Sequence, residues 1–172
     1  IPVVLFPGNA FQLTNKADAL LLLSLISGRN AEWLIGQHVQ AAKAIQQSAL
    51  ETISTGYILI DGGNTTAVER VSKTKPLQRD AIDEVVSTAL AGQLLGHKLI
   101  YLEAGSGAQN PVPTALIKAV KTAIDIPLIV GGGLTSTDAI KQAYEAGADI
   151  VVVGNYLETH LEKMVDFCAV RN

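Results

Sequence analysis

The 172-residue sequence is poor in the residue types that mark several large classes of protein. It contains one cysteine, Cys168, so no disulfide can form within the chain. Only 17% of its residues are charged, which is too little for a long disordered tail or a coiled coil. The 13 Lys and Arg residues form no cluster and are outnumbered by 16 Asp and Glu residues, giving a net charge of −3. Because nucleic-acid binding depends on neutralising phosphates, we expect no nucleic-acid partner.

Long apolar runs and targeting segments are also lacking. The longest apolar run, over residues 17–26, is interrupted by Asp18 and Ser24 and is shorter than the roughly 20 residues that span a bilayer. No segment has the basic start, apolar stretch and small-residue cleavage site of a signal peptide. These absences predict one soluble domain in a reducing, cytoplasmic compartment. The chain begins inside an apolar run at Ile1, which predicts an incomplete N-terminus.

Apolar residues, by contrast, make up 48% of the chain and gather in short runs. Parallel strands that are covered on both faces appear in a sequence as continuous apolar runs, so each run predicts a buried strand. Six strands are predicted, over residues 3–6, 17–26, 57–60, 98–102, 127–130 and 149–153.

Helical patterns lie between most of these strands, with apolar residues recurring at helical spacing. Five helices are predicted, over residues 31–50, 80–95, 115–124, 139–146 and 156–165. Pro113 and Ser136 stand where helices would begin, and Gly96 and Gly147 stand where helices would end. Only the first connection, over residues 7–17, is predicted as a loop with turns.

The alternation of strands and helices predicts the fold class. It implies a parallel sheet with right-handed crossovers, and six units without a reversal favour a closed barrel over an open sheet. A complete TIM (β/α)8 barrel typically needs about 250 residues and eight strands. We therefore expect a single barrel domain over residues 1–172 that covers about strands 3 to 8, with the N-terminal two units absent.

The ends of the last two predicted strands point to a phosphate site. Gly131-Gly132-Gly133 follows one strand and Gly154-Asn155 follows the next. Barrel active sites lie at the carboxyl ends of the strands, and phosphate is often held after the last two. Glycines there let main-chain N–H groups approach an anion closely. The alternative is that these glycines serve only tight turns.

The predicted strand at residues 98–102 leads into the motif Tyr101-Leu102-Glu103-Ala104-Gly105-Ser106-Gly107. Because side chains alternate along a strand, Tyr101 and Glu103 face the same side, either into the barrel or outward toward the helices. A carboxylate beside an anion site is suited to drawing the proton from an attacking hydroxyl, as a general base does. The alternative is a structural carboxylate that pairs with a lysine.

These motifs together carry a resemblance. Residues 101–108, the glycines at 131–133 and the pair Gly154-Asn155 resemble the geranylgeranylglyceryl phosphate synthase family. Its members are barrel prenyltransferases that join an isoprenoid diphosphate to glycerol 1-phosphate through an ether bond. Residues 5–9, 24–30 and 35–38 resemble the branch that includes many bacterial members, and the resemblance covers essentially the whole chain.

The resemblance implies sn-glycerol 1-phosphate as the acceptor and geranylgeranyl or a similar long-chain prenyl diphosphate as the donor. It implies that Glu103 and Tyr101 are catalytic, with Glu103 orienting or deprotonating the attacking hydroxyl. The apolar groove for the prenyl chain has Phe6 and Phe11 as candidate lining residues. The residues expected to surround glycerol 1-phosphate are Tyr101, Leu102, Glu103, Ala104, Gly105, Ser106, Gly107, Gly132, Gly133, Gly154 and Asn155.

The resemblance also implies Mg²⁺ as the cofactor on the diphosphate, because this hard cation takes carboxylate and phosphate oxygens. The family holds the ion with an Asp-Pro-Asp-type motif after the first barrel strand and a hydroxyl residue after the second, and neither is present in this sequence. We therefore expect no metal ligand in this chain. A homo-oligomer, either a dimer or a hexamer, is expected, with peripheral membrane contact through the lipid product.

Two other functions remain open at the level of sequence. A phosphate-binding isomerase or lyase barrel would account for the glycine turns and for Asp61 at a strand end, but would leave Glu103 without a role. A non-catalytic truncated barrel would keep only the phosphate site. Lys73, Lys75 and Arg79 belong to a long loop that either contacts the diphosphate or is simply solvated.

The remaining candidate residues have weaker support. His38, His97 and His160 have no second ligand at metal spacing, and we expect structural roles for them. Cys168 has no partner motif, and Trp33 is expected to serve packing or an interface.

Overall fold

Six parallel strands organise the chain, and the computed structural model describes residues 1–9 and 12–170. The strands lie side by side in chain order, so each pairs with its neighbours in the sequence. Their bounds are β1 (Val4–Leu5), β2 (Ala19–Leu25), β3 (Glu51–Leu59), β4 (Leu99–Glu103), β5 (Leu128–Gly131) and β6 (Ile150–Val152). The six strands predicted from the apolar runs are confirmed, but β1 and β6, at the two edges of the sheet, contain no buried residue and so are not the buried strands that were expected.

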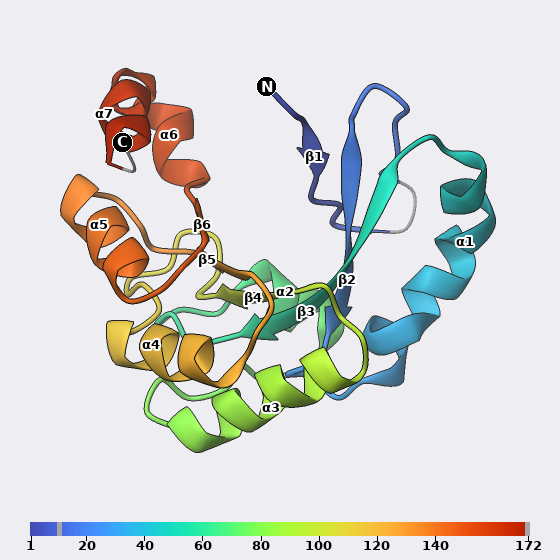
Figure 1. Cartoon of the computed structure of the whole chain (residues 1–172), viewed down its shortest axis with the longest axis horizontal. Coiled ribbons are helices and arrows are strands. Elements are labelled where there is room, and N and C mark those ends of the chain that lie inside the picture. Colours follow the sequence, from blue (N-terminus) through green and yellow to red (C-terminus); the bar gives the residue numbers. More distant parts are fainter. Residues whose placement is uncertain (10–11, 171–172) are drawn as a thin grey trace.

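Helices cover the convex side of this curled sheet, as Figure 1 shows. Their bounds are a π-helix (Glu32–Gly36), α1 (Gln37–Gln47), α2 (Ala67–Ser72), α3 (Ile82–Leu94), α4 (Thr114–Ala123), α5 (Thr137–Glu145), α6 (Asn155–Thr159), a 3₁₀ turn (Leu161–Lys163) and α7 (Met164–Ala169). A curled parallel sheet with helices outside it confirms the predicted TIM-barrel class. In the described part of the chain β1 and β6 do not pair, so the sheet stays open between them.

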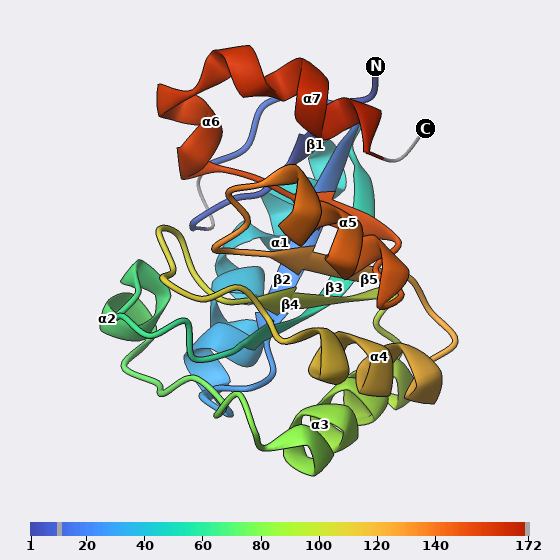
Figure 2. The same cartoon turned by 90° about the vertical axis from the view of Figure 1, so that its left-hand side faces the viewer.

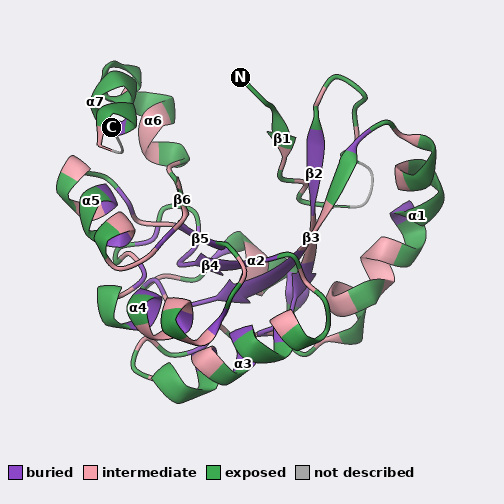
Figure 3. Ribbon diagram, in the orientation of Figure 1, coloured by how far each residue is buried: buried purple, intermediate pink, exposed green. Residues whose placement is uncertain are grey.

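Alternation along the strands creates two apolar layers, one on each face of the sheet. Figure 3 shows that the strands in the middle of the sheet are largely buried. On the outer face, strand residues pack against α3 and α4, and this layer includes Ile58, Ile60, Ile100, Leu102, Leu128, Val85, Ala89, Leu116 and Val120. The inner face is lined by Leu21, Leu25, Tyr57, Leu59, Leu99, Tyr101 and Ile129. A strand buried on both faces needs apolar residues at every position, which explains the continuous runs in the sequence.

One boundary was predicted wrongly. The helix expected over residues 31–50 ends at Gln47, and β3 begins at Glu51 rather than at Tyr57. Ser48 adopts an extended conformation and its hydroxyl donates to the carbonyl of Ile45 at 2.7 Å, which closes the helix. The first half of β3 is partly exposed and carries polar residues, so it lacks the apolar run that marks a fully buried strand.

Two helical segments also differ from the prediction. The helix α2 was not predicted; it begins with a capping box in which the side chains of Thr66 and Glu69 each accept a hydrogen bond from the other's backbone N–H group. The helix predicted over residues 156–165 is broken at His160, whose backbone leaves the helical region, into α6, the 3₁₀ turn and α7. Within residues 7–17, the described positions form no helix, as predicted.

The described residues include no helix long and apolar enough to cross a membrane.

Candidate functional site

The structure decides which way Tyr101 and Glu103 point. Tyr101 packs in the inner apolar layer and is 1% exposed, whereas its neighbours Ile100 and Leu102 pack in the outer layer against the helices. Because side chains alternate along β4, Glu103 faces inward with Tyr101. Of the two orientations left open by the sequence, the inward one is therefore correct.

The carboxylate of Glu103 is buried at the carboxyl end of β4. Its Oε1 accepts a hydrogen bond from the backbone N–H of Gly105 at 2.8 Å, and it also accepts one from the hydroxyl of Tyr101. Burial raises the pKa of Glu103 above its ordinary value, and the two hydrogen bonds oppose the rise. The ion pairs among the described residues do not include Glu103, so the predicted alternative of a lysine partner finds no support there.

Tyr101 serves as a hydrogen-bond donor and not as a base. Burial, and then the nearby charge of Glu103, raise the pKa of its hydroxyl far above the ordinary value. The hydroxyl therefore keeps its proton and acts as a hydrogen-bond donor toward the carboxylate. In this pair the carboxylate of Glu103 can accept a proton, and the hydroxyl of Tyr101 holds that carboxylate in place.

Glycines at the end of β5 allow the main chain to pack directly on this pair. A Cβ atom at Gly131 would lie 2.6 Å from the Tyr101 hydroxyl oxygen and 2.7 Å from Oε2 of Glu103. A Cβ at Gly132, where φ is +84°, would lie 2.5 Å from Oε1 of Glu103. Side chains at these positions would displace Glu103, so the turn requires glycine for space as well as for conformation.

Residues after three different strands meet at this place. The hydroxyl of Ser106, in the loop after β4, donates to Oδ1 of Asn155 after β6. Gly133, with φ of +71°, packs against the backbone of Pro111, at the far end of the same β4 loop. The predicted glycerol phosphate residues after β4, β5 and β6 therefore lie together. The side chains of Leu102 and Ala104 pack in the outer core, so that only their main chain is available to a ligand.

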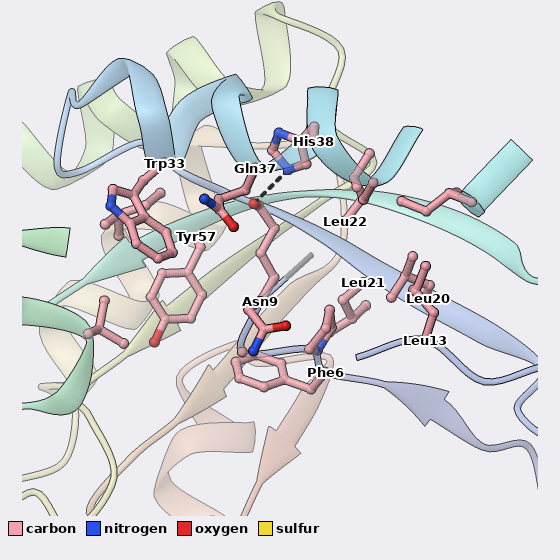
Figure 4. Close-up of a pocket in the computed structure, with 17 residues that line it drawn as sticks. Phe6, Asn9, Leu13, Leu20, Leu21, Leu22, Trp33, Gln37, His38 and Tyr57 are labelled. Carbon is pink, nitrogen blue, oxygen red and sulfur yellow. Dashed lines mark hydrogen bonds between the residues drawn. The ribbon is translucent and has the colours of Figure 1, made fainter. Parts of the chain in front are cut away.

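An apolar cavity of about 150 Å³ is lined mainly by β2, α1 and the segment after β1, and neither Tyr101 nor Glu103 lines it. Figure 4 shows Phe6, Tyr57 and Trp33 around it, with Gln37 and His38 from the adjoining helix. The rings of Phe6 and Tyr57 line the cavity and also contact the Tyr101 ring, at centroid distances of 5.5 Å and 5.4 Å. The predicted lining residue Phe6 is in place, whereas Phe11 lies outside the described residues.

The basic residues of the long loop after β3 have separate positions. Nη1 of Arg79 donates to the carbonyls of Asp61 and Asn110, at 3.2 Å and 3.4 Å, and so joins the loops after β3 and β4. Lys73 ends α2 in a left-handed conformation, and Lys75 is exposed. The carboxylate of Asp61 accepts from the N–H of Gly63 at 2.9 Å, which is the geometry of a turn cap.

The histidines make contacts of a structural kind. Nε2 of His38 bonds the carbonyl of Leu23 at 2.8 Å, and Nδ1 of His97 bonds the Ser54 hydroxyl at 2.9 Å. Burial, with a smaller effect of His38, lowers the pKa of His97. The ring of His160 stacks on Tyr156 at 4.2 Å. Across residues 1–9 and 12–170, no group of three His, Cys, Asp or Glu side chains is placed to hold a metal ion.

Cys168 is exposed with a free thiol. Trp33 packs partly against the inner apolar layer, as predicted, and also lines the apolar cavity.

Sequence reasoning missed two polar residues beside the site. Nδ2 of Asn64 donates to the carbonyl of Gly107 at 3.2 Å, and the methyl group of Thr66 lies against Gly105. The pattern Thr66-x-x-Glu69 before a helix was a readable signal for Thr66. No local pattern marks Asn64, because its partner lies 43 residues away in the sequence.

Comparison with known proteins places this site in a family context. The model of the PcrB family matches residues 1–171. A curated geranylgeranylglyceryl phosphate synthase of Zunongwangia profunda is 57% identical over 158 residues, which are 92% of this chain and 68% of that protein. The protein of the same name from Korarchaeum cryptofilum is 39% identical, over 92% of this chain and 65% of its own length.

A solved structure that matches this chain is also that of a geranylgeranylglyceryl phosphate synthase. The (S)-3-O-geranylgeranylglyceryl phosphate synthase of Thermoplasma acidophilum, in complex with its substrate sn-glycerol-1-phosphate, superposes with a TM-score of 0.88 at 36% identity. The alignment covers 99% of this chain and 67% of that one. The chain thus spans about two thirds of the length of the proteins that it matches.

Proposed function

The chain belongs to the PcrB family, and from this premise we propose that the protein is a prenyltransferase acting on sn-glycerol 1-phosphate and a long-chain prenyl diphosphate such as geranylgeranyl diphosphate. The observation that carries the proposal is the buried Glu103 carboxylate, held by Tyr101 and Gly105 against the glycine turn after β5. The names of the matching relatives, and the glycerol phosphate bound to one of them, support the same function.

In the proposed reaction, Glu103 accepts the proton of the attacking glycerol hydroxyl. The hydroxyl oxygen forms a bond to the allylic carbon of the prenyl group while the bond from that carbon to the diphosphate oxygen breaks. The diphosphate leaves with the electron pair of the broken bond. The raised pKa of Glu103 makes its carboxylate a stronger proton acceptor, and the hydroxyl of Tyr101 holds it in one orientation.

The glycine-rich turns are suited to the phosphate of the acceptor substrate. The loop after β4 and the turn after β5 carry glycines with positive φ, among them Gly105, Gly107, Gly132 and Gly133. Main-chain N–H groups in such turns form concave anion sites, and these glycines have no side chain to obstruct a close approach, although the N–H of Gly105 already donates to Glu103. Bound in this place, the phosphate would bring the glycerol hydroxyls next to Glu103.

The apolar cavity is suited to the prenyl chain of the donor. Its lining is dominated by leucine and aromatic side chains, and Phe6 and Tyr57 connect it to Tyr101. A hydrocarbon chain gains about 0.8 kcal/mol for each methylene group that it buries. An isoprenoid in this cavity would point its reactive end toward the Tyr101–Glu103 pair.

Magnesium, assembly and location are further proposals that stem from the family resemblance. Among the described residues no group of three His, Cys, Asp or Glu side chains is placed to hold a metal ion, and no step of the mechanism is assigned to Mg²⁺. We also propose a cytoplasmic homo-oligomer, a dimer or a hexamer, that meets the membrane through its lipid product. Mass measurement in solution would determine the assembly.

The proposed function is tested by an enzymatic assay of the full-length protein. Glycerol 1-phosphate is supplied with prenyl diphosphates of graded length, with and without Mg²⁺, and the prenyl ether is detected by mass spectrometry. We expect an ether product and an equal amount of released diphosphate. Absence of ether with every donor would contradict the proposal, and phosphate binding without transfer would favour the non-catalytic alternative.

A further inference from the structure

The loop after β4 has two local hydrogen bonds, from the N–H of Ala108 to the carbonyl of Gly105 at 3.1 Å and from the N–H of Gly105 to Glu103 at 2.8 Å. Gly105 and Gly107 have φ values of +99° and +69°, and the residue between them, Ser106, is exposed. Glycines in such conformations have several other accessible states, and restricting them costs conformational entropy. Contacts with neighbouring segments add to these local bonds in restricting the loop to one conformation.

Two asparagines from different strand ends hold the tip of this loop. On one side, Oδ1 of Asn155 accepts the hydroxyl of Ser106. On the other side, Nδ2 of Asn64, from the turn after β3, donates to the carbonyl of Gly107 at 3.2 Å. Adjacent residues at the tip are thus tied to the two neighbouring parts of the barrel rim.

The turn after β3 is itself firmly attached, so it can act as a support. The carbonyl of Gly62 accepts from the N–H groups of Gln109 and Asn110, at 3.0 Å and 3.1 Å. The carboxylate of Asp61 closes the turn on Gly63, and Arg79 joins the carbonyls of Asp61 and Asn110. In Figure 2 the loop after β4 runs beside the segment that leads into α2.

Asn64 has one further property. Its Oδ1 is buried and has no hydrogen-bond partner among the described residues, although its Nδ2 is in use. A buried acceptor without a partner costs stability. An apolar side chain would avoid this cost, so the value of asparagine here lies in the bond that its Nδ2 makes to the loop.

From these contacts we infer that Asn64 is a positioning residue for glycerol 1-phosphate, which fixes the loop at residues 105–107 in the conformation that receives the phosphate. The inference rests on the proposed function. Asn64 acts through the carbonyl of Gly107 and takes no part in proton transfer, which belongs to Glu103. Its loss should weaken acceptor binding and leave the chemical step nearly intact.

The test compares Asn64→Ala with Thr65→Ala in the full-length protein. Thr65 is the next residue in the same turn, and its side chain is exposed. We expect Asn64→Ala to raise the KM and the calorimetric Kd for glycerol 1-phosphate by about three- to tenfold, the effect of one hydrogen bond. The kcat should stay within about twofold of the wild type, and Thr65→Ala should change neither constant.

Three results would overturn the inference. The first is that Asn64→Ala has the same KM and Kd as a wild type that does bind glycerol 1-phosphate. This result would contradict the role of Asn64 but not the proposed function. The second is a fall in kcat alone. The third is a wild type that binds no glycerol 1-phosphate, which contradicts the proposed function too. If Asn64→Ala does not fold, the same measurements are made on the isosteric Asn64→Asp, which loses the donor and should raise KM at least as much.

Discussion

At the scale of single residues, burial has different consequences for the two neighbouring titratable groups of the site, Glu103 and Tyr101. Burial raises the pKa of both Glu103 and Tyr101. The consequences differ because the ordinary pKa is 4.5 for the carboxyl group and 10.0 for the phenol. Glu103 becomes a better proton acceptor, and Tyr101 becomes a donor that does not ionise near neutral pH. Such separation of two roles by environment is common in acid–base catalysis.

Glu103→Gln tests the role of the carboxylate. The amide keeps the shape of the side chain but cannot accept the proton, so kcat should fall about 100-fold or more. The pH dependence of the wild type supplies a second readout. Because the ionised form is the base, kcat should decline as pH falls through the raised pKa, with a midpoint above the ordinary carboxyl value of 4.5.

The control for this variant is Glu145→Gln, which removes an exposed carboxylate from α5. It should leave kcat and its pH profile unchanged. Binding of glycerol 1-phosphate to Glu103→Gln, followed by calorimetry, should remain close to that of the wild type. Unreduced turnover in Glu103→Gln would remove Glu103 from the proton-transfer step.

At the scale of elements, the short helix α2 supports the site through its first residue. The hydroxyl of Thr66 caps the helix by accepting from the N–H of Glu69 at 3.1 Å, while the methyl group of the same side chain lies against Gly105. A helix of six residues is not stable alone, so the cap and the contact with the loop after β4 hold it together. One threonine thus couples a helix start to the glycine-rich loop.

Thr66→Ala is expected to lower the free energy of unfolding by about 1 kcal/mol, the typical loss of a helix cap. Chemical denaturation measures the change. Thr66→Ser separates the two functions of the side chain, because it keeps the capping oxygen and loses only the methyl group. We expect it to retain most of the stability, and equal losses in both variants would show that the cap contributes little.

Thr122→Ala provides the matched control for this measurement. Thr122 is exposed near the end of α4, and its hydroxyl donates to the carbonyl of Lys118, one turn earlier in the same helix. Its replacement should change stability by less than about 0.5 kcal/mol.

At the scale of the whole molecule, the sheet separates the apolar residues into two layers, one that stabilises the fold and one that lines the site. The outer layer joins the strands to α3 and α4, and it includes Leu102, which is fully buried. The inner layer carries Tyr57, which lines the cavity, and Tyr101, whose ring contacts that of Tyr57 and whose hydroxyl bonds to Glu103. Alternate residues of the same strand therefore serve stability on one face and the site on the other.

Leu102→Ala should lower the free energy of unfolding by about 2–5 kcal/mol, because it leaves a cavity in the outer layer. Leu95→Ala, at a position that is 80% exposed, should change it by less than about 0.5 kcal/mol. Denaturant titration of both variants gives the comparison. Similar small losses in the two would contradict the assignment of Leu102 to the outer core.

The sequence alone determined much of this protein. Continuous apolar runs located all six strands, and a strand covered on both faces must be apolar throughout, although the edge strands β1 and β6 contain no buried residue. Glycines at 131–133 marked a turn that needs positive φ, and the motif around Glu103 pointed to the chemistry. These signals are local, since each depends on residues that are close in the chain. The exposed half of β3 and the helix α2 were missed because the first lacks an apolar run and the second is short.

Only the tertiary structure decided how these local features meet. It turned Tyr101 and Glu103 inward, since alternation in β4 leaves the choice of face to the packing of its neighbours. It also brought Asn64 to Gly107 across 43 residues, a contact that depends on two loops closing beside each other at the rim. The raised pKa of Glu103 is also decided by the tertiary structure, because its burial arises from the assembled fold and from no single segment of the chain.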